Sequence, residues 1–542
     1  MDITFNKNED AMKMAYSQVR QKLEIIHQGG GKKAIQKQKE RNKLTARERI
    51  DYLCDIGSSF IEIGAFAGYE MYAQEGGCPA GGTVSGIGYV SGRQCVIVAN
   101  DQTVKAGAWF PITGKKNLRM QEIAMENKLP IIYLVDSAGV YLPMQDEIFP
   151  DKEHFGRIFR NNAQMSAMGI TQIAAVMGAC VAGGAYLPIM SDETLMVEGN
   201  GSIFLAGSYL VKAAIGEDID NETLGGAVTH TEISGIADYK FDNEQACLDH
   251  IKKIMSKLGA PKQAGFDRIK SIAPKQPSGS IYGILDENNA RPYNMVDLIE
   301  CIVDADSFDQ FKEDYGKTIV CGYARIEGWA VGIVANQRLI VKSKKGEMQM
   351  GGVIYNDSAD KAARFILNCN QKKIPLVFLQ DVTGFMVGSR SEHSGIIKDG
   401  AKLVNAVANS VVPKITIVVG NSFGAGNYAM CGKAYDPRFI YAWPTAKIAV
   451  MGGDQAAKTL LQIQVAALKS KGKEITPQEE EKLLNEIKQR YTQQTSPYYA
   501  AARLWVDDII DPALTRHYIA EGIAAANQNE TILPLKTGVF QV

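Results

Sequence analysis

The sequence predicts two tandem α/β domains derived from an internal duplication. Four segments of the first half recur in the same order in the second half, and each half alternates short buried strands with helices. The matching pairs are residues 97–100 with 333–336, 126–139 with 371–384, 173–178 with 415–420, and 182–186 with 424–428. Their offsets are 236 (333 − 97), 245 (381 − 136), 242 (420 − 178) and 242 (428 − 186). Ordered matches at a nearly constant offset indicate two copies of one domain.

Each copy has the sequence pattern of α/β units. Short runs rich in Val, Ile and Leu end in turns that contain Gly, and helical patterns occur between them, as at 118–127 and 359–371. This order is typical of βα units whose ligand-contacting loops lie at the carboxyl ends of the strands. A chain of 542 residues is also too long for one ordinary core. We therefore predict an N-terminal domain at 1–259, a linker at 260–293 and a C-terminal domain at 294–542.

Three segments lie outside the repeated pattern. The linker is rich in Pro and Gly, so we expect little regular structure there. Residues 13–52 are charged and helical in pattern, with a break at the three glycines 29–31. Residues 455–493 are a strongly charged helical insertion in the second copy, which we expect to form a solvated helical pair.

The composition excludes several classes of protein. The charged fraction is 22% and the net charge is −1, so there is no general attraction to nucleic acid or to an anionic membrane. The apolar runs stay below the roughly 20 residues of a membrane helix. The N-terminus resembles neither a secretory signal nor a transit peptide, which makes a cytoplasmic location the expectation, or the mitochondrial matrix in a eukaryote. The nine cysteines contain no C-x-x-C pair and the six histidines are dispersed, which argues against a disulfide framework and against a metal site.

The Gly-rich loops at 178–186 and 420–428 are the features best suited to chemistry. Small residues leave backbone N–H groups unshielded, and a following helix adds the positive end of its dipole. Such a loop can stabilise an enolate oxygen; the alternative is that the glycines only permit tight packing of strand on helix. The sequence has no G-x-S-x-G elbow, no P-loop and no H-E-x-x-H, and His154 and His393 are interpreted as polar loop residues. The residues therefore indicate two anion-stabilising loops without an obvious nucleophile.

Several blocks of the sequence resemble the carboxyltransferase (β) subunits of biotin-dependent acyl-CoA carboxylases. These blocks are residues 44–51, 135–139, 181–186, 399–404 and 450–453. The resemblance extends from about residue 29 to the C-terminus. It implies a fold of two crotonase-like (ClpP/crotonase) domains, in agreement with the duplication.

Two further stretches are similar to one branch of this family, the methylcrotonyl-CoA and geranyl-CoA carboxylases. They are residues 142–159 and 383–388, where propionyl-CoA enzymes have a proline at the position of Thr383. Residues 138–141 and Arg160 depart from the usual sequence of the branch, which leaves the exact acyl group open. The resemblance implies carboxylation at the γ carbon of an α,β-unsaturated acyl-CoA, with the 3-methylcrotonyl-CoA of leucine catabolism as the expected substrate.

The resemblance also implies roles for individual residues. Carboxybiotin would release CO2 and the substrate carbanion would attack it, so two oxyanions need stabilisation. The expected catalytic groups are the amides of Gly183 and Gly184 for the thioester enolate, and those of Gly424 and Ala425 for the biotin ureido oxygen. The expected acyl-CoA-binding residues are Ala138, Gly139, Val140, Tyr141, Ala182, Ala185, Tyr186 and Arg160. The expected biotin-binding residues are Thr383, Gly384, Phe385, Phe423 and Gly426.

Partners follow from the same resemblance. Family members build each site between copy one of one subunit and copy two of another, which implies a homo-hexamer of β subunits. Biotin is expected on a separate α subunit that contains the biotin carboxylase and biotin carrier, and no metal is expected in this chain. Residues 11–14 match the Ala-Met-Lys-Met tetrapeptide that biotin ligases modify, but only twelve residues precede Lys13. Apolar residues at helical spacing (Met12, Val19, Leu23) instead predict an amphipathic helix.

Other interpretations stay open. The chain could be the β subunit of a geranyl-CoA or propionyl-CoA carboxylase, or a subunit of a biotin-dependent acyl-CoA decarboxylase that runs the transfer in reverse. A crotonase-type hydratase or hydrolase usually needs a positioned Glu or Asp in the acyl site, and the loop at 178–186 contains neither. A non-catalytic scaffold that binds CoA or a biotinylated partner would not need intact glycines in both loops.

Overall fold

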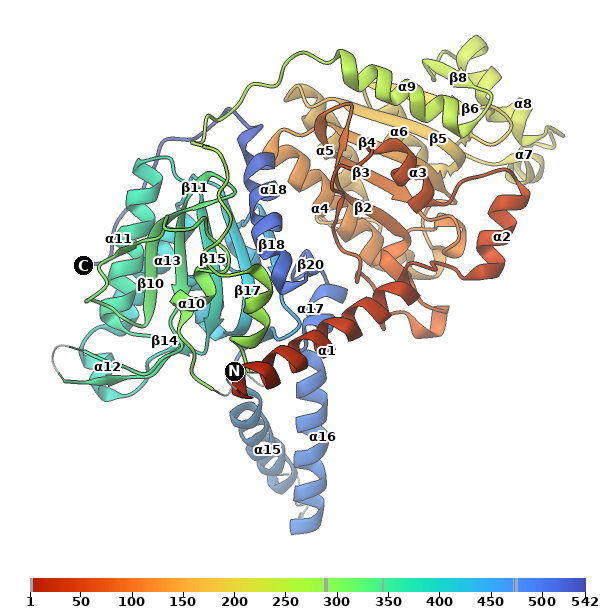
Figure 1. Cartoon of the computed structure of the whole chain (residues 1–542). Helices are drawn as coiled ribbons and strands as arrows, with labels where there is room; N and C mark the ends of the chain where they lie inside the picture. Colours follow the sequence, from red (N-terminus) through yellow and green to blue (C-terminus); the bar gives the residue numbers. More distant parts are fainter. Residues whose placement is uncertain (1–2, 287–290, 344–345, 471, 473–475) are drawn as a thin grey trace. The chain divides into compact units, whose positions relative to one another are not determined.

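The computed structural model of the chain contains two units, each with its own sheet and core (Figure 1). It describes residues 3–286, 291–343, 346–470, 472 and 476–542. The N-terminal unit comprises Gln21–Gln263 and Ala502–Leu504, and the C-terminal unit comprises Met1–Arg20, Ala264–Ala501 and Trp505–Val542. The division therefore lies four residues beyond the sequence-based boundary at 259 (263 − 259), and the residues up to Arg20 group with the C-terminal unit.

The N-terminal unit is built on a mixed sheet with the order β1-β2-β3-β4-β5-β6-β8 and with β7 beside β5. Its strands are β1 (Ile61–Glu62), β2 (Thr83–Val90), β3 (Arg93–Asn100), β4 (Ile131–Ser137), β5 (Gln172–Val181), β6 (Glu193–Val197), β7 (Ser202–Phe204) and β8 (Tyr239–Phe241). Ile132 of β4 packs in one core with α3 (Ala46–Leu53) and α9 (Glu244–Lys257). Its neighbour Tyr133 contacts Gln121 of α4 (Pro111–Asn127), which also contacts α5 (Phe155–Ala167). Successive side chains of β4 thus pack against helices on opposite faces of the sheet.

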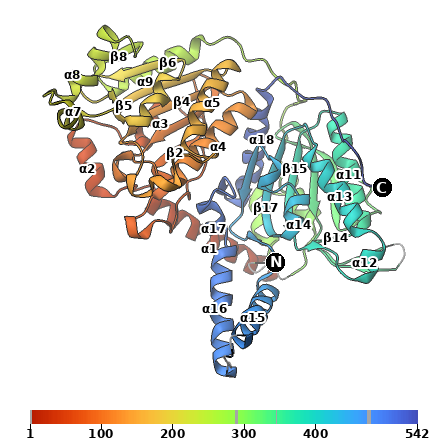
Figure 2. The ribbon, with the colours of Figure 1, turned by 180° about the vertical axis from the view of Figure 1, so that it is seen from behind.

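The C-terminal unit repeats this arrangement with the order β20-β18-β17-β15-β11-β10-β9 and with β19 beside β17. Its strands are β9 (Asp309–Phe311), β10 (Ile319–Ile326), β11 (Trp329–Asn336), β15 (Leu376–Val382), β17 (Lys414–Phe423), β18 (Phe439–Ala442), β19 (Lys447–Ala449) and β20 (Asp508–Ile509). Helices α11 (Asn356–Gln371) and α13 (Ile396–Ala408) cover one face, as Figures 1 and 2 show. Helix α18 (Thr515–Asn527) packs against Ile415 of β17 at the other face.

The strand registers confirm the predicted tandem α/β duplication. Ile97 of β3 pairs with Ile132 of β4, and their equivalents Ile333 of β11 and Val377 of β15 pair in the same way. In each copy the hairpin β2–β3 or β10–β11 is antiparallel, and the strands that follow it are parallel. Parallel strands covered by helices on both faces need continuous apolar runs, which explains the Val-rich and Ile-rich segments of the sequence.

The offset between the copies changes where the second copy has additional residues. The chain advances 11 positions from the end of β3 to the start of α4 (111 − 100), but 20 positions from the end of β11 to the start of α11 (356 − 336). The longer segment contains the short strands β12 (Val341–Lys342), β13 (Met348–Gln349) and β14 (Val353–Ile354). This difference of nine residues (20 − 11) raises the offset from 236 to 245.

The two helices predicted at 118–127 and 359–371 are present, but both begin earlier. Helix α4 starts seven residues before the prediction (118 − 111), and α11 starts three residues before it (359 − 356). At the start of α4, Thr113 Oγ1 accepts a hydrogen bond from the Phe110 N–H (3.0 Å). Pro111 at the first helical position and this hydroxyl contact stabilise a turn that has no helical apolar pattern.

The N-terminal segment forms α1 (Ile3–Ile26), α2 (Lys32–Glu40) and α3, and the glycines at 29–31 separate the first two helices as predicted. Lys13 lies on the exposed side of α1 and pairs with Glu9 at 2.6 Å, whereas Met12 is buried. The Ala-Met-Lys-Met tetrapeptide is therefore part of the predicted amphipathic helix.

The predicted insertion forms a hairpin of α15 (Gly453–Ser470) and α16 (Pro477–Thr495) that extends away from the sheet (Figure 1). Residues 471 and 473–475 of that insertion lie outside the described residues, as do residues 287–290 of the predicted linker. The described part of the linker contains the 3₁₀ helix Ser278–Gly283 and little other regular structure. Within the described ranges, no helix is long and apolar enough to cross a membrane.

Candidate active site

The Gly-rich loop of the N-terminal unit leaves β5 through a sharp turn. Val181 ends the strand, Ala182 has a left-handed backbone (φ 55°), and a helical turn over Ala182–Ala185 follows. The first N–H groups of a 3₁₀ turn have no acceptor within the turn, and Gly183 supplies one of them. A Cβ on Gly184 would meet no atom within 4 Å, which leaves space in front of the loop.

The predicted segment 138–141 lies beside this loop. Gly139 has a left-handed backbone (φ 89°), and a Cβ there would lie 3.1 Å from the carbonyl oxygen of Val181. The Tyr141 N–H donates to the Trp109 carbonyl (3.0 Å), which fixes the far end of the segment. The structure thus brings together the two acyl-side segments that the sequence predicts, 138–141 and 182–186.

Aromatic side chains pack beside the loop at 182–186. Phe155 contacts Trp109 (ring centroids 4.9 Å apart) and Phe159 (5.2 Å), and Phe159 in turn contacts Tyr186 (5.9 Å). Arg160, a predicted site residue, is exposed and donates to Gln164 in its own helix (2.7 Å). Sequence reasoning missed the phenylalanines, although their spacing of four residues on a helical pattern was a usable signal.

The Gly-rich loop of the C-terminal unit has the same backbone design. Strand β17 ends at Phe423, Gly424 is left-handed (φ 54°), and α14 (Gly424–Ala429) follows. By the offset of 242, Gly424 corresponds to Ala182, so the left-handed turn occurs at the same position of both copies (424 − 182). A Cβ on Gly424 would lie 2.9 Å from the Val450 carbonyl oxygen. Gly424 and Ala425 are the first two residues of this helix, so their N–H groups have no acceptor within it.

The remaining predicted biotin-side residues lie next to this loop. The N–H and Oγ1 of Thr383 both donate to the Gly352 carbonyl (2.8 and 3.1 Å). The strand β16 (Gly384–Phe385) pairs with β14. A Cβ on Gly426 of the loop would lie 3.4 Å from Gly384 Cα. These residues therefore form one neighbourhood within the C-terminal unit.

An apolar hollow of about 500 Å³ opens beside the loop at 420–428, because Val450 lines it and the Val450 carbonyl oxygen lies next to Gly424. Val450 and Ile463 line it and are largely exposed. Tyr491, from α16, closes one side and donates to the Met451 carbonyl (2.6 Å). The helical hairpin therefore contributes an apolar wall next to the loop instead of being solvated on all sides.

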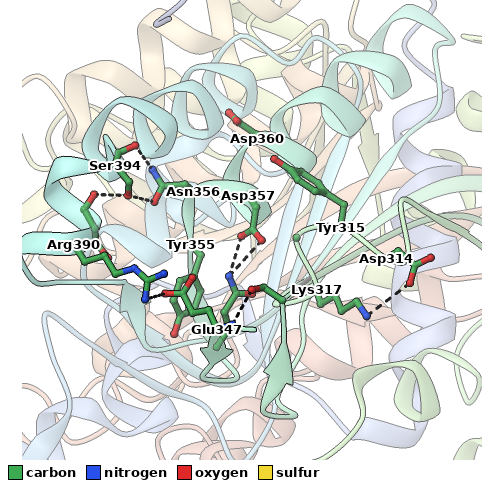
Figure 3. Close-up of a pocket in the computed structure, with 14 residues that line it drawn as sticks. Asp314, Tyr315, Lys317, Glu347, Tyr355, Asn356, Asp357, Asp360, Arg390 and Ser394 are labelled. Carbon is green, nitrogen blue, oxygen red and sulfur yellow. Dashed lines mark hydrogen bonds and ion pairs between the residues drawn. The ribbon is translucent and has the colours of Figure 1, made fainter. Parts of the chain in front are cut away.

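A second hollow, of about 480 Å³, is lined by polar residues of the C-terminal unit (Figure 3). Its charged groups include the pairs Glu347–Arg390 (3.2 Å) and Asp314–Lys317 (3.8 Å). Its wall includes residues from the insertion between β11 and α11, and its lining residues do not include the predicted site residues. Among the residues that the structure describes, no group of three or more His, Cys, Asp or Glu side chains could hold a metal ion.

A buried charge cluster lies at Gly178, the first residue of the Gly-rich loop at 178–186. Asp136, near the end of β4, contacts Lys43 Nζ (2.5 Å) and Arg49 Nη2 (3.1 Å), and Arg49 also pairs with Glu244 (2.7 Å). All four side chains are at most 6% exposed. Burial lowers the pKa of Lys43, whereas for Arg49 the two carboxylates outweigh burial and raise the pKa. A Cβ on Gly178 would lie 1.8 Å from Asp136 Oδ1, so the carboxylate requires a glycine there.

The second copy has an equivalent carboxylate, Asp381, at Gly420, the first residue of the Gly-rich loop at 420–428. It accepts hydrogen bonds from the Asn421 N–H (2.9 Å) and the Tyr293 hydroxyl (3.0 Å), and it pairs with Arg338 (3.3 Å). A Cβ on Gly420 would lie 2.6 Å from its Cγ. Burial raises the pKa of Asp381, and the Arg338 guanidinium partly offsets this effect.

Sequence reasoning gave no role to these two carboxylates. A signal was present, because Asp136 and Asp381 end apolar strands at aligned positions, and the glycines they face are also aligned. The cationic partners gave no such signal, because Lys43, Arg49 and Arg338 lie outside the repeated segments.

An ion pair of the same N-terminal region gives a testable pH dependence. Arg47 donates to both carboxylate oxygens of Glu62 (2.8 and 2.9 Å). Burial alone would raise the pKa of Glu62, but the hydrogen bonds from Arg47 hold it below its ordinary value. A carboxyl group whose pKa is lower in the folded state than in the unfolded state stabilises the fold at pH values above the unfolded-state pKa. This stabilisation is lost as the pH falls through the folded-state pKa. We therefore expect Glu62→Gln to reduce the fall in thermal unfolding temperature between about pH 5.5 and about pH 3.5.

Glu40→Gln, at an exposed position in the same unit, is the control for this experiment. It should keep the pH dependence of the wild type. An equal pH dependence of the two variants would contradict the assignment of acid sensitivity to Glu62.

Residues 37–540 of the chain match the carboxyl transferase domain family. The chain is 48% identical over 527 residues to the mitochondrial methylcrotonoyl-CoA carboxylase beta chain of Dictyostelium discoideum, covering 97% of this chain and 87% of that protein. It is 48% identical over 507 residues to the biotin-dependent 3-methylcrotonyl-coenzyme A carboxylase beta1 subunit of Mycobacterium tuberculosis, covering 94% and 93%. The crystal structure of the geranyl-CoA carboxylase beta subunit of P. aeruginosa superposes with a TM-score of 0.86 at 37% identity, covering 99% and 97%.

Proposed function

This chain belongs to the carboxyl transferase domain family, and from this membership we propose that it is a carboxyltransferase subunit that moves CO2 from carboxybiotin to an acyl-CoA. The substrate is 3-methylcrotonyl-CoA, and the new carbon–carbon bond forms at the γ carbon. The 48% identity to two relatives named for methylcrotonyl-CoA supports this substrate. The family resemblance and the tandem crotonase-like fold predicted from the sequence are both confirmed.

The observation that carries this proposal is the pair of equivalent loops, one in each unit. Both begin with a left-handed residue at the same position of the repeat, Ala182 or Gly424, and in both a helical turn follows whose first N–H groups have no acceptor within the turn. Carboxyl transfer between two carbonyl compounds develops negative charge on two oxygens, and each loop suits one of them.

On the acyl side, the amides of Gly183 and Gly184 would donate to the thioester oxygen. When a γ proton leaves an α,β-unsaturated thioester, the charge is delocalised onto that oxygen, so donors fixed at the oxygen stabilise a remote carbanion. The wall formed by Phe155, Phe159 and Tyr186 would limit access of water to this carbanion. Ala138 and Gly139 would lie beside the bound thioester, since their segment borders Val181.

On the biotin side, the residues fit a ureido ring with an apolar body. The amides of Gly424 and Ala425 would hold the ureido oxygen, and the apolar hollow at Val450 and Ile463 lies directly beside them. Bound carboxybiotin supplies the CO2 and, after its release, the base that takes up the substrate proton. Thr383 and Phe385 would orient the ring, because their segment contacts Gly426 through Gly384.

Assembly would complete the site. The acyl-side and biotin-side loops belong to different units of the chain, so we propose that the N-terminal unit of one subunit meets the C-terminal unit of another in a homo-hexamer. Exposed apolar side chains, Tyr209 of α7 (Ser208–Ile215) in the N-terminal unit and Val450 next to Gly424 in the C-terminal unit, support burial in such an assembly. Biotin would arrive on a separate α subunit with biotin carboxylase and carrier domains. The complex would act in leucine catabolism, in the cytoplasm or in the matrix of a mitochondrion.

The test combines the purified chain with a biotin carboxylase–carrier partner, ATP and labelled bicarbonate. Acid-stable label is compared on methylcrotonyl-CoA, geranyl-CoA and propionyl-CoA. We expect kcat/KM for methylcrotonyl-CoA to exceed the others by at least about 10-fold, the usual effect of a mismatched apolar group in a pocket. A preference for geranyl-CoA would reassign the acyl group within the same branch. Transfer to none of them, with a partner shown to be carboxylated, would refute the carboxylase and favour a decarboxylase that runs in reverse.

A further inference from the structure

The strand ladder is interrupted beneath each Gly-rich loop at the same place. In the N-terminal unit the pairing of β4 with β5 shifts register between Val135 and Ser137, and in the C-terminal unit that of β15 with β17 shifts between Gln380 and Val382. The residue at the interruption is Asp136 in one copy and Asp381 in the other. Irregularities of this kind end regular pairing and change the direction of a strand, and they are frequent next to active sites.

Each carboxylate occupies the space that the interruption creates. The Asp136 N–H donates to Asn100 Oδ1 (3.2 Å), and the Asp381 N–H donates to Asn336 Oδ1 (3.1 Å), so both backbones are fixed in the same way. The Asp381 carboxylate accepts a hydrogen bond from the Asn421 N–H (2.9 Å). This N–H lies where the regular pairing of β15 with β17 is interrupted. A buried acceptor that replaces a missing ladder bond fixes the strand that it holds.

The strands held in this way are those that carry the loops. Gly178 faces Asp136 and lies four residues before the left-handed Ala182 (182 − 178). Gly420 faces Asp381 and lies four residues before the left-handed Gly424 (424 − 420). A shift of either carboxylate would therefore move the strand end from which the catalytic N–H groups project.

We infer that Asp136 and Asp381 are positioning residues, Asp136 for the acyl-CoA loop and Asp381 for the biotin loop. The inference rests on the proposed function of the two loops. It also assigns a role to residues 43–51, because Lys43 and Arg49 supply the positive charge that keeps Asp136 in place. The second copy uses Arg338 and Tyr293 instead, so the two supports can be disabled separately.

The test compares Asp136→Asn and Asp381→Asn with Asp304→Asn in the full-length chain assembled with its biotin carboxylase–carrier partner. Asp304 is a matched control, because it is also buried, pairs with Arg516 (2.7 Å) and accepts the Gly328 N–H (3.0 Å). Two rates are measured: complete transfer to methylcrotonyl-CoA, and release of CO2 from the carboxylated carrier without acyl-CoA. Only the second rate is independent of the acyl-CoA loop.

A misplacement of about 1 Å in a catalytic group can cost up to about 10²-fold in rate. We expect Asp381→Asn to lower both rates by about 30-fold or more, and Asp136→Asn to lower only the complete transfer by this factor, in kcat with KM for acyl-CoA changed less than about threefold. Asp304→Asn should leave both rates within about twofold of the wild type.

Glycine variants provide a second route if an Asp variant does not fold. Gly178→Ala and Gly420→Ala displace the carboxylates without removing charge, and Gly156→Ala is their control because a Cβ there meets no atom within 4 Å. The same separation of the two rates is expected. The inference is wrong if the wild type is active and the Asp136 and Asp381 variants behave like Asp304→Asn. It is also wrong if the wild type is active and the glycine variants behave like Gly156→Ala. An inactive wild type would instead refute the proposed function.

Discussion

Gly424→Val should lower kcat for carboxyl transfer by roughly 10²–10³-fold, the usual cost of losing one oxyanion donor. Gly424 has φ 54°, a left-handed conformation that β-branched residues adopt only under strain. A Cβ there would also lie 2.9 Å from the Val450 carbonyl oxygen. The turn must therefore open, which moves the N–H groups of Gly424 and Ala425 away from the ureido oxygen.

The variant should still bind methylcrotonyl-CoA, because the acyl-side loop at Gly183 belongs to the other unit. Binding is measured by calorimetry on the assembled complex, and kcat by acid-stable label. Gly279→Val is the control in the C-terminal unit, since a Cβ at Gly279 meets no atom within 4 Å. Wild-type kcat in Gly424→Val would show that this loop does not hold the carboxyl donor.

Arg49→Met should lower the free energy of unfolding of the N-terminal unit by about 3–5 kcal/mol, the usual cost of breaking a buried ion pair. Arg49 is 1% exposed and bonds both Asp136 and Glu244. Its loss leaves Asp136 paired with Lys43 (2.5 Å) and leaves Glu244 with the neutral Leu44 N–H (3.2 Å) as a donor. An additional Glu244→Gln should restore part of the loss, because one uncompensated charge is then removed.

Urea unfolding followed by circular dichroism measures this change, and hydrogen exchange in β4 and β5 assigns it to the N-terminal unit. Lys39→Met is the control, because Lys39 pairs with Glu48 at the surface and such pairs contribute up to about 1 kcal/mol. A loss for Arg49→Met no greater than that for Lys39→Met would contradict a structural role of the cluster.

Local patterns predicted the fold well, and the errors have physical causes. The repeated segments gave the tandem sheets, and Pro and Gly marked the linker and the break before α2. Helix α4 was predicted too short because its first turn is stabilised by Thr113 and Pro111 instead of by an apolar stripe. The helical hairpin is charged in sequence, yet Ala457 packs inside it and Ile463 lines an apolar hollow.

The parts of the candidate site that consist of backbone N–H groups could be predicted from the sequence. Gly183, Gly184 and Gly424 identify their loops because only small residues leave N–H groups open, and the structure gives both loops the same left-handed turn. The role of these amides stays a prediction until the variants are measured. Trp109, whose ring packs against Phe155, could not be assigned to the site from the sequence, because no local pattern connects these two residues.

The sequence by itself determined the duplication, the place of the two loops and the family, because each is encoded in residues that are adjacent or regularly spaced. Only the tertiary structure decided what holds the loops in place. The partners of Asp136 in the buried cluster lie 93 and 87 positions before it (136 − 43, 136 − 49), and Glu244 lies 108 positions after it (244 − 136). A contact over such a separation depends on which strands and helices become neighbours when the sheet forms, and no local pattern encodes that choice.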